Sequence, residues 1–229
     1  MRIEDIKKRL EAVPLFKELD KVEMDHIIQI TQTRFYKKNI YVFMQGDPLD
    51  RMFFIHSGKI KIYKTDSTGK EQIIAFLESG EMFPHAGLFR NGGYPAHAEV
   101  MEDAQLISIP KTEFEEILLK NPLVCIKLFK VLGEKIVELQ NRLEEQILHN
   151  TYEQIIMMLL RLCKTNGIKV SHLYKITTHF TNRELANMIG TSRETVSRTI
   201  NLLKKRQFLF TDQDGFFLVN KEILKQEIL

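Results

Sequence analysis

Cysteine is scarce in this sequence of 229 residues. Its two cysteines, Cys125 and Cys163, lie in helix-like apolar stretches, and neither has a partner at a metal-binding or redox spacing. We expect both to be reduced thiols in the core. The seven histidines are scattered without an HExxH or HxH pair, so their spacing indicates no metal site.

Long apolar runs and catalytic motifs are also missing. No run approaches the ~18 residues of a membrane span. Residues 1–16, MRIEDIKKRLEAVPLF, lack the continuous apolar core of a signal peptide. We therefore expect a cytoplasmic protein without a membrane partner. The sequence has no paired carboxylates, nucleophile–base constellation or P-loop, so we do not expect an enzyme.

The net charge is only +3, but the basic residues are unevenly distributed. Residues 150–229 contain 12 Lys and Arg against 7 Asp and Glu, whereas residues 1–149 contain 21 against 23. This distribution is expected if only the C-terminal part meets a polyanion. The chain length favours two domains over one.

The first half of the chain changes from a helical to a strand pattern. Residues 3–31 predict two short helices, interrupted at Pro14 and resuming at Asp20. Short apolar runs then predict an antiparallel barrel or roll between residues 35 and 109. Residues 59–77 form its clearest hairpin. Hairpins are expected at the regularly spaced glycines, which are Gly46, Gly58, Gly69, Gly80 and the pair Gly92-Gly93.

A long helix is predicted for residues 122–149. Its apolar positions recur at steps of three or four residues, close to one stripe of a heptad repeat. The rest of the helix is polar, which favours a narrow seam against a second copy and hence a homodimer. Packing against its own roll is the alternative. The predicted seam consists of Leu132, Ile136, Leu139, Leu143 and Ile147.

The C-terminal part, residues 150–229, predicts a winged helix. An apolar helix is followed by a turn at Gly167 and a short strand near YKITTHF, residues 174–180. Two helices around Gly190 come next, and then a hairpin with Asp214-Gly215 as its turn signal. The predicted fold class is α+β. The predicted domains are a β-roll at 1–121, a dimerisation helix at 122–149 and a winged helix at 150–229.

Two helix starts flank Gly190. Thr181 and Glu184 have the spacing of a capping box, and Thr191 and Glu194 have it again. Gly190 permits a tight turn between the two helices. The pattern is typical of a helix-turn-helix.

The second helix has a polar and an apolar face. At about 100° per residue, Val196, Ile200 and Leu203 share one face. The opposite face presents the candidate base-reading residues Arg193, Glu194, Ser197 and Arg198. Arginine can donate to guanine in the major groove, a carboxylate can accept from cytosine, and serine can contact either. For Glu194 a base contact and a local cap both remain open, and the two can coexist.

Basic residues end this helix. Lys204, Lys205 and Arg206 suit the negative end of the helix dipole, and contact with DNA phosphate is an equally good interpretation.

Residues 180–205, FTNRELANMIGTSRETVSRTINLLKK, closely resemble the helix-turn-helix of the cyclic AMP receptor protein and fumarate-nitrate reduction regulator (Crp/Fnr) family. VPLFKELD at 13–20 and QGDPLDRMFFIHSGKIKIY at 45–63 are similar to its N-terminal helices and its cyclic-nucleotide-binding β-roll. The resemblance implies a homodimeric bacterial regulator whose Arg193, Glu194 and Arg198 read a TGA...TCA palindrome, with Thr181 on a phosphate. Because the chain has both Arg193 and Ser197, the resemblance does not predict the outer bases of each half-site. RNA polymerase is an expected partner of an activator.

The resemblance does not extend to the family's nucleotide contacts. Where cyclic AMP receptors have a Gly-Glu, an Arg-Ser and a Thr-Ser pair, this chain has Pro84-His85, Pro95-Ala96 and Leu139-Gln140. Without the arginine a buried phosphate lacks a counter-charge, so cyclic AMP is not expected to bind by the usual contacts. No cysteine precedes Cys125, which excludes the family's N-terminal iron–sulfur cluster. No haem ligand pair is matched, and we expect no cofactor.

His85, Tyr94 and His97 lie in the segment that lines the family's effector pocket, and Leu139 and Gln140 belong to the same site by resemblance. Either an unknown small molecule or protonation acts there, or these side chains fill an empty pocket. The alternative function is a cyclic-nucleotide-binding module that acts on a protein partner. It leaves the helix-turn-helix unexplained.

Overall fold

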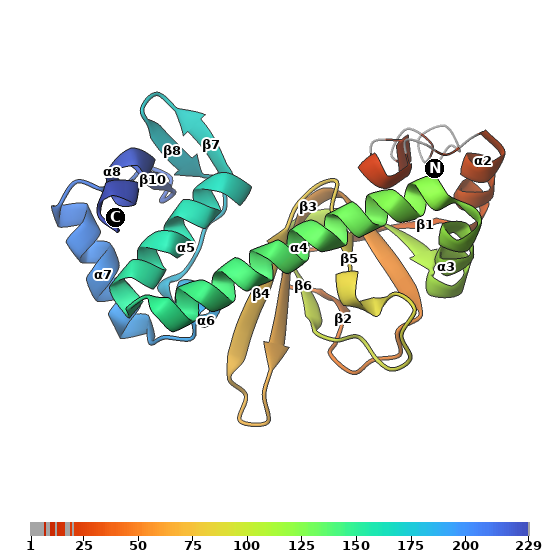
Figure 1. The fold of residues 1–229 in the computed structure, drawn as a ribbon, viewed down its shortest axis with the longest axis horizontal. Helices are drawn as coiled ribbons and strands as arrows, with labels where there is room; N and C mark the ends of the chain where they lie inside the picture. Colours follow the sequence, from red (N-terminus) through yellow and green to blue (C-terminus); the bar gives the residue numbers. More distant parts are fainter. Residues whose placement is uncertain (1–6, 8–9, 12, 17–18, 20, 229) are drawn as a thin grey trace. The chain divides into compact units, whose positions relative to one another are not determined.

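The computed structural model describes residues 7, 10–11, 13–16, 19 and 21–228. They form two compact units, Met1–Ile136 and Val137–Leu229. The division falls inside helix α4, Pro122–Leu148, which the sequence predicts as a separate element at 122–149. Figure 1 shows the elements of each unit, and the fold is of the predicted α+β class.

Unit 1 is built on an antiparallel sheet. The strand order is β1-β6-β3-β4, with β2 also pairing with β6 and β5 with β3, which is the predicted roll. The two long strands β3 and β6 form the middle of the sheet, and they pair along most of their length. The strands are β1 (Gln32–Tyr36), β2 (Tyr41–Phe43), β3 (Arg51–Thr65), β4 (Glu71–Leu77), β5 (Met82–Phe83) and β6 (His97–Pro110).

The hairpin predicted at residues 59–77 is formed by β3 and β4. Ile60 lies opposite Leu77, and Thr65 lies opposite Glu71. Asp66 fixes the turn, because its Oδ1 accepts hydrogen bonds from the backbone N–H groups of Thr68 at 2.8 Å and Lys70 at 3.0 Å. The prediction is confirmed, and the hydrogen bonds of this Asx turn explain the polar sequence between the strands.

A hairpin at Gly58 is not formed, and that part of the prediction is wrong. Gly58 lies inside β3, where the register with β6 shifts on both sides of it. It has a φ of +91°, and a Cβ built on it would lie 2.5 Å from the Cα of Ala104. The glycine therefore marks a β-bulge with close backbone contact, which gives the same sequence signal as a turn.

Helices cover one face of the roll. The described helical elements here are a 3-10 turn at Pro14–Phe16, α2 (Lys21–Ile30), α3 (Lys111–Lys120) and the first half of α4. Their contact with the sheet centres on Phe54, whose ring lies 4.8 Å from that of Phe16 and 5.5 Å from that of Phe114. The second predicted helix corresponds to α2. Asp20 and most of the first predicted helix lie outside the described residues.

The interior of the roll is filled by aromatic rings. Phe43 stacks on Tyr94 with ring centroids 3.7 Å apart, and Phe53 stacks on Phe83 at 5.3 Å. All four side chains are buried. A short 3-10 helix, His85–Gly87, follows β5.

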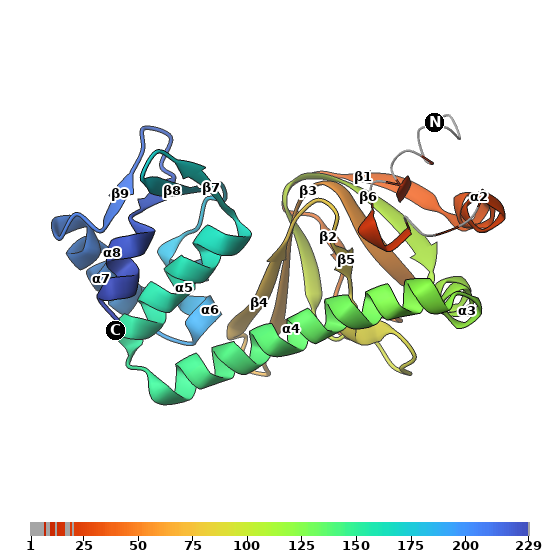
Figure 2. The ribbon, with the colours of Figure 1, turned by 45° about the horizontal axis from the view of Figure 1, so that its top comes forward.

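Unit 2 contains the predicted helices and wing, which Figure 2 shows from a second direction. Its sheet has the order β7-β8-β10-β9. Two elements were not predicted: β7 starts at Gly167 in place of a turn, and α8 follows the terminal hairpin. The elements are α5 (Thr151–Thr165), β7 (Gly167–Val170), β8 (Leu173–Ile176), α6 (Asn182–Ile189), α7 (Arg193–Lys205), β9 (Leu209–Thr211), β10 (Phe217–Val219) and α8 (Lys221–Gln226).

The wing turn is formed as the sequence predicts. Asp212 accepts hydrogen bonds from the backbone N–H groups of Asp214 at 3.0 Å and Phe216 at 2.9 Å. Gly215 takes a φ of +89°, which favours glycine. Asp212 also forms an ion pair of 2.6 Å with Lys175 on β8, which ties the wing to the middle of the sheet.

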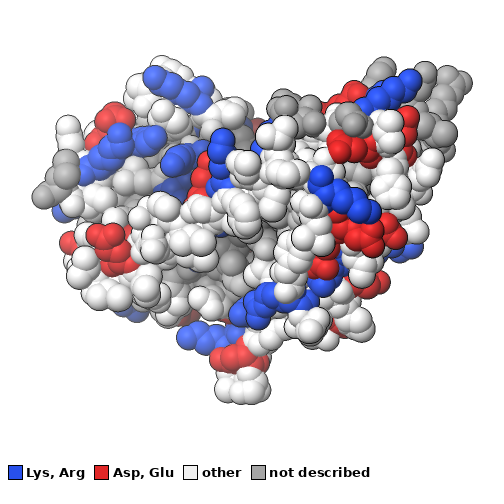
Figure 3. Space-filling view, turned by 45° about the vertical axis from the view of Figure 1, so that its right-hand side comes forward, with Lys and Arg blue, Asp and Glu red and all other residues white. Residues whose placement is uncertain are grey.

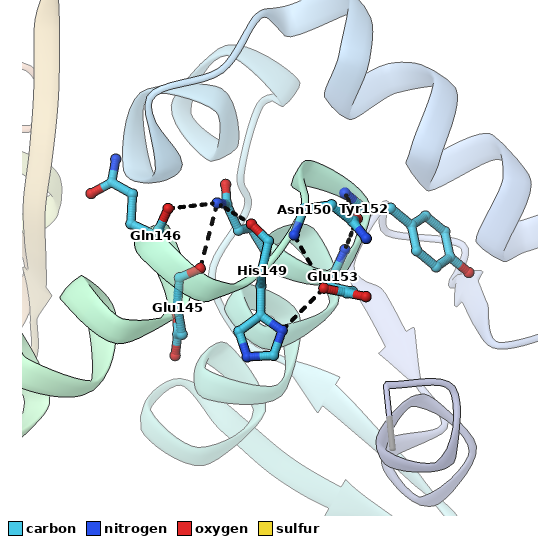
Figure 4. A network of polar contacts seen from close by, with 7 residues as sticks. Glu145, Gln146, His149, Asn150, Tyr152 and Glu153 are labelled. Atoms are coloured by element: carbon cyan, nitrogen blue, oxygen red, sulfur yellow. Dashed lines mark hydrogen bonds and ion pairs between the residues drawn. The ribbon is translucent and has the colours of Figure 1, made fainter.

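A polar network joins the end of α4 to the start of α5 (Figure 4). Asn150 caps α5 by accepting from the N–H groups of Tyr152 and Glu153, and Glu153 completes a capping box. The same Glu153 carboxylate lies 3.0 Å from Nδ1 of His149. The side-chain amide of Gln154 donates to the carbonyl of His149 at 2.8 Å. These bonds satisfy backbone groups at both helix ends.

The two cysteines have no bonded partner in the described part of the chain. Cys163 is buried in α5, and burial raises the pKa of its thiol to about 11. Cys125 is half-buried on α4. Both are free cysteines, and the expected place in the core is confirmed for Cys163 but not for Cys125, which is only half-buried.

Gly58→Ala should lower the free energy of unfolding by about 2–4 kcal/mol, since the new methyl group adds overlap with Ala104 to an unfavourable φ. The matched control is Gly69→Ala, where φ is +82° but no atom lies within 4 Å of the new Cβ. There only backbone strain of about 1 kcal/mol is expected. Urea unfolding measures both, and equal losses would contradict the close contact at Gly58.

Candidate nucleic-acid interface

Helix α6 begins with the predicted capping box. Thr181 Oγ1 accepts from the N–H of Glu184 at 3.1 Å, and the Glu184 carboxylate accepts from the N–H of Thr181 at 2.8 Å. Thr181 Oγ1 also lies 2.8 Å from that carboxylate. Gly190 ends the helix in the left-handed conformation, at a φ of +75°, and its N–H donates to the carbonyl of Ala186. The turn between the helices is thus fixed by backbone hydrogen bonds.

The start of α7 differs from the prediction. Ser192, not Thr191, is the N-cap, and its Oγ accepts from the N–H of Thr195 at 3.1 Å. A capping box of Thr191 and Glu194 is therefore wrong. Thr191 instead donates its N–H to the carbonyl of Ala186, so it belongs to the preceding turn. Adjacent hydroxyl residues give the same capping signal, and the sequence does not separate them.

The rotation of α7 is set by its buried face. Val196, Ile200 and Leu203 are 0%, 3% and 0% exposed. Arg193, Glu194 and Arg198 are exposed on the other side, and Ser197 is half-buried between the two faces. The structure therefore places the four predicted base-reading residues on one side of one helix. A helix of this kind fits the major groove.

The Glu194 carboxylate is held in its charged form. Its pKa is lowered by a hydrogen bond from its own backbone N–H, then by one from Ser192, and by the charges of Arg193 and Arg198. The side chain thus has a local role at the helix start and remains an exposed acceptor. Both interpretations of Glu194 are compatible with this geometry.

The basic residues at the end of α7 have different surroundings. Lys204 Nζ lies 5.8 Å from the ring centroid of Phe217 in the wing, whereas Lys205 is exposed. Arg206 forms an ion pair with Glu227 and donates to the hydroxyl of Tyr152 at 3.3 Å. Arg206 is therefore engaged within the unit. Lys204, Lys205 and Thr181 stay candidate phosphate contacts.

Charges of both signs are interspersed on the face drawn in Figure 3. In unit 2 some basic residues are neutralised inside the protein, such as Lys175 by Asp212 and Arg161 by Glu145 at 2.5 Å. The exposed arginines of α7 form no ion pair within the described part of the chain. The exposed arginines of α7 are therefore available to a polyanion, as are other exposed basic residues of unit 2 such as Lys164, Lys169 and Arg183.

The predicted seam on α4 is mostly exposed. Ile136, Leu139, Leu143 and Ile147 are 57%, 54%, 58% and 69% exposed, whereas Leu132 packs in part against the core of unit 1. Four exposed aliphatic side chains on one stripe are uncommon for a surface that faces only water.

The predicted effector residues have different surroundings. A cavity of about 310 Å³ in unit 1 has Tyr94 in its lining, without His85 or His97. His97 Nδ1 accepts from the N–H of Gln45 at 3.1 Å, and its ring stacks on Tyr63. His85 begins the 3-10 helix after β5. Leu139 and Gln140 are exposed on the part of α4 that belongs to unit 2.

The surroundings of Tyr94 are set by an aromatic ring from a distant part of the sequence. Phe43 occupies the face of Tyr94, and burial raises the pKa of the Tyr94 hydroxyl. The pattern of the sequence around Tyr94 does not indicate this contact, because Phe43 lies about fifty residues earlier. Apart from Tyr94, the residues that line the observed cavity were not predicted as effector residues.

Clusters of metal-ligating side chains and membrane-spanning helices are both absent from the described part of the chain. No three His, Cys, Asp or Glu side chains gather there as a metal site would require. None of the helices described is long and apolar enough to cross a bilayer.

Two family models match the chain. Residues 33–121 match the cyclic nucleotide-binding domain, and residues 153–227 match the Crp-like helix-turn-helix domain. The cyclic AMP receptor protein of Thermus thermophilus is similar, with 29% identity over 85% of this chain and 87% of its own. The anaerobic regulatory protein of Bacillus subtilis is 26% identical over 87% of this chain and 84% of its own.

Solved structures share the fold. A variant of CooA from Carboxydothermus hydrogenoformans gives a TM-score of 0.75 at 22% identity, covering 93% of this chain and 92% of that one. FixK2 from Bradyrhizobium japonicum gives 0.74 at 19% identity, covering 86% and 96%. Fold and surface define a winged-helix protein with a β-roll domain. The chain belongs to the Crp/Fnr family, and it is a DNA-binding transcription regulator and not an enzyme.

Ser192→Ala should lower the free energy of unfolding of unit 2 by about 1 kcal/mol, since it removes the acceptor for the Thr195 N–H. Thr191→Ala is the control and is expected to change it by less than about 0.5 kcal/mol. Chemical denaturation of the full chain without DNA makes the comparison. A larger loss for Thr191→Ala would restore Thr191 as the cap.

Proposed function

We propose that this regulator binds a TGA...TCA palindrome as a homodimer in the cytoplasm. The observation that carries the proposal is the exposure of Arg193, Glu194 and Arg198 on the side of α7 opposite its buried face. Each arginine can donate two hydrogen bonds to a guanine, and Glu194 can accept from the amino group of cytosine. In a duplex with TGA on one strand, the guanine presents the acceptors for an arginine, and the cytosine paired with it presents the amino group for Glu194.

Affinity and specificity come from different residues in this proposal. Lys204, Lys205 and Thr181 contact phosphate and set the position of the helix, whereas the α7 face reads the bases. Lys205 is exposed and available, and Thr181 is exposed at the start of α6, where its hydroxyl donates to Glu184 and would turn to a phosphate on binding. The negative end of α7 also favours these lysines, so their charges act on the helix and on DNA at once.

The exposed stripe of α4 forms the dimer in this proposal. Two copies that bury Ile136, Leu139, Leu143 and Ile147 against each other place a two-fold axis along the helix pair. A palindrome requires this symmetry, with half-sites about one DNA turn, ~34 Å, apart. If the protein acts as an activator, RNA polymerase is its next partner.

The effector in this proposal is not cyclic AMP held by the usual contacts, and no metal, haem or iron–sulfur cofactor is required. At the position of the family's phosphate-binding pair, Pro95 and Ala96 offer neither a charge nor a side-chain donor, and Ala96 is buried. A phosphate placed there would lose its hydration without compensation. A different small molecule is the proposed effector.

Arg198→Ala should weaken binding to a TGA...TCA duplex by about 1–3 kcal/mol and relax the base choice at one position of each half-site. Fluorescence anisotropy with the palindrome and with single-base variants measures both effects. Lys169→Ala is the control because it removes an exposed positive charge of unit 2 outside α7. Equal affinity of the native protein for a scrambled duplex would contradict base reading.

Leu143→Glu should raise the dissociation constant of the dimer at least about tenfold, because a carboxylate buried in an apolar seam loses several kcal/mol of hydration. Leu148→Glu is the matched control: Leu148 is 68% exposed, against 58% for Leu143, but faces away from the stripe. Light scattering over a concentration series gives the mass. A dimer unaffected by Leu143→Glu would place the interface elsewhere.

A further inference from the structure

A cavity of about 310 Å³ lies within unit 1, where strands β1, β2, β3 and β6 meet the loop at Asp47–Asp50. Phe43, Phe53 and Tyr94 supply apolar rings to its lining, and Arg34, Arg51 and Ser108 supply polar groups. It is separate from the DNA-reading face of α7, which belongs to unit 2. None of the predicted base-reading or phosphate residues lines it.

Arg51 is a half-buried cation held in place by neutral partners. Its Nε donates to Ser108 Oγ at 3.0 Å, and its Nη2 donates to the Ser108 carbonyl at 3.3 Å. Within the described residues, no Asp or Glu lies within ion-pair distance of its guanidinium. A guanidinium has five N–H donors, so three remain for another group. A half-buried cation without a counter-charge favours an anionic ligand.

Arg34 adds a second guanidinium to the same cavity. It lies on β1 opposite Leu106 of β6, and its side chain is exposed. Its side chain makes no hydrogen bond or ion pair with any residue that the structure describes. Arg51 is therefore fixed in the wall, whereas Arg34 is free to turn toward a ligand. Two guanidinium groups match the two oxygens of a carboxylate.

The apolar wall determines the shape of the ligand. The rings of Phe43 and Tyr94 are stacked at an interplanar angle of 8°, and the ring of Phe53 lies 5.6 Å from that of Phe43. Tyr94 is held by its hydroxyl, which accepts from the N–H of Arg51 at 3.2 Å. The wall is thus a rigid aromatic surface, which favours a flat apolar body.

Two carboxylates in the lining limit the charge of the ligand. Asp50 accepts from the Tyr94 hydroxyl at 3.2 Å, and Asp47 accepts from the N–H of Met44 at 2.8 Å. Both are exposed and lie at the mouth of the cavity. Neither forms an ion pair with Arg51 or Arg34, but their negative charges weaken the attraction for an anion, so a dianion such as phosphate is disfavoured relative to a monoanion.

We propose that this cavity binds a small monocarboxylate with a flat apolar body, with its carboxylate on Arg51 and Arg34 and its body against Phe43 and Phe53. This proposal adds to the proposed function the chemical class of an effector and the place where it binds. It rests on the proposed function only in giving the bound molecule a regulatory role. Binding to the cavity is measured without DNA, so its failure is distinguishable from failure of the proposed DNA readout.

Calorimetric titration of the full chain with benzoate tests the proposal, and benzamide is the neutral probe of the same shape. Benzoate should bind with a dissociation constant below about 10 mM, and benzamide at least tenfold more weakly. Inorganic phosphate at the same concentration should not displace benzoate. Absence of benzoate binding, equal binding of benzamide or displacement by phosphate would each overturn the proposal.

Variants locate the binding. Arg51→Met and Arg34→Met should each weaken benzoate at least about fivefold, since each removes donors to a carboxylate. Arg34 is exposed and without a partner in the described chain, so its loss tests the site even if Arg51→Met unfolds. Arg90→Met is the matched control, because Arg90 is exposed and outside the cavity lining. Unchanged affinity in Arg34→Met, or an equal loss in Arg90→Met, would overturn the assignment.

Discussion

Burial of Val196, Ile200 and Leu203 fixes the rotation of helix α7 about its own axis, and this rotation decides which side chains reach solvent. A helix turned by one residue, about 100°, would present a different set of groups. Each of these aliphatic side chains contributes roughly 1.5–3 kcal/mol when fully buried, so the orientation is strongly defined. The capping hydrogen bonds of Thr181 and Ser192 then fix where the two helices begin.

Unit 1 depends on a different constraint, which is the filling of its roll by aromatic rings. Phe43 and Tyr94 in contact occupy space that would otherwise be open, and the remaining cavity lies beside them, next to Arg51. Protein interiors are close-packed, so the positions of the large side chains determine where space for a ligand remains.

Much of the fold could be predicted from the sequence, because local signals agree with tertiary packing. Asp66 and Gly69 at one turn and Asp214 and Gly215 at the other specify hairpins through their own backbone preferences. Gly58 shows the limit, because a positive φ is required in a bulge as well as in a turn. The exposed polar face of α7 follows from helical periodicity, whereas the Arg51–Ser108 contact joins residues that are 57 apart and leaves no local pattern.

The central claim is that the exposed face of α7 reads TGA half-sites in a symmetric complex. Selection of bound duplexes from a random DNA library tests it without assuming the site. The account predicts enrichment of a palindrome with TGA and TCA in its two halves, centred about one DNA turn, roughly 10 base pairs, apart. Enrichment of single, unpaired half-sites or of sequences without the TGA core would contradict it.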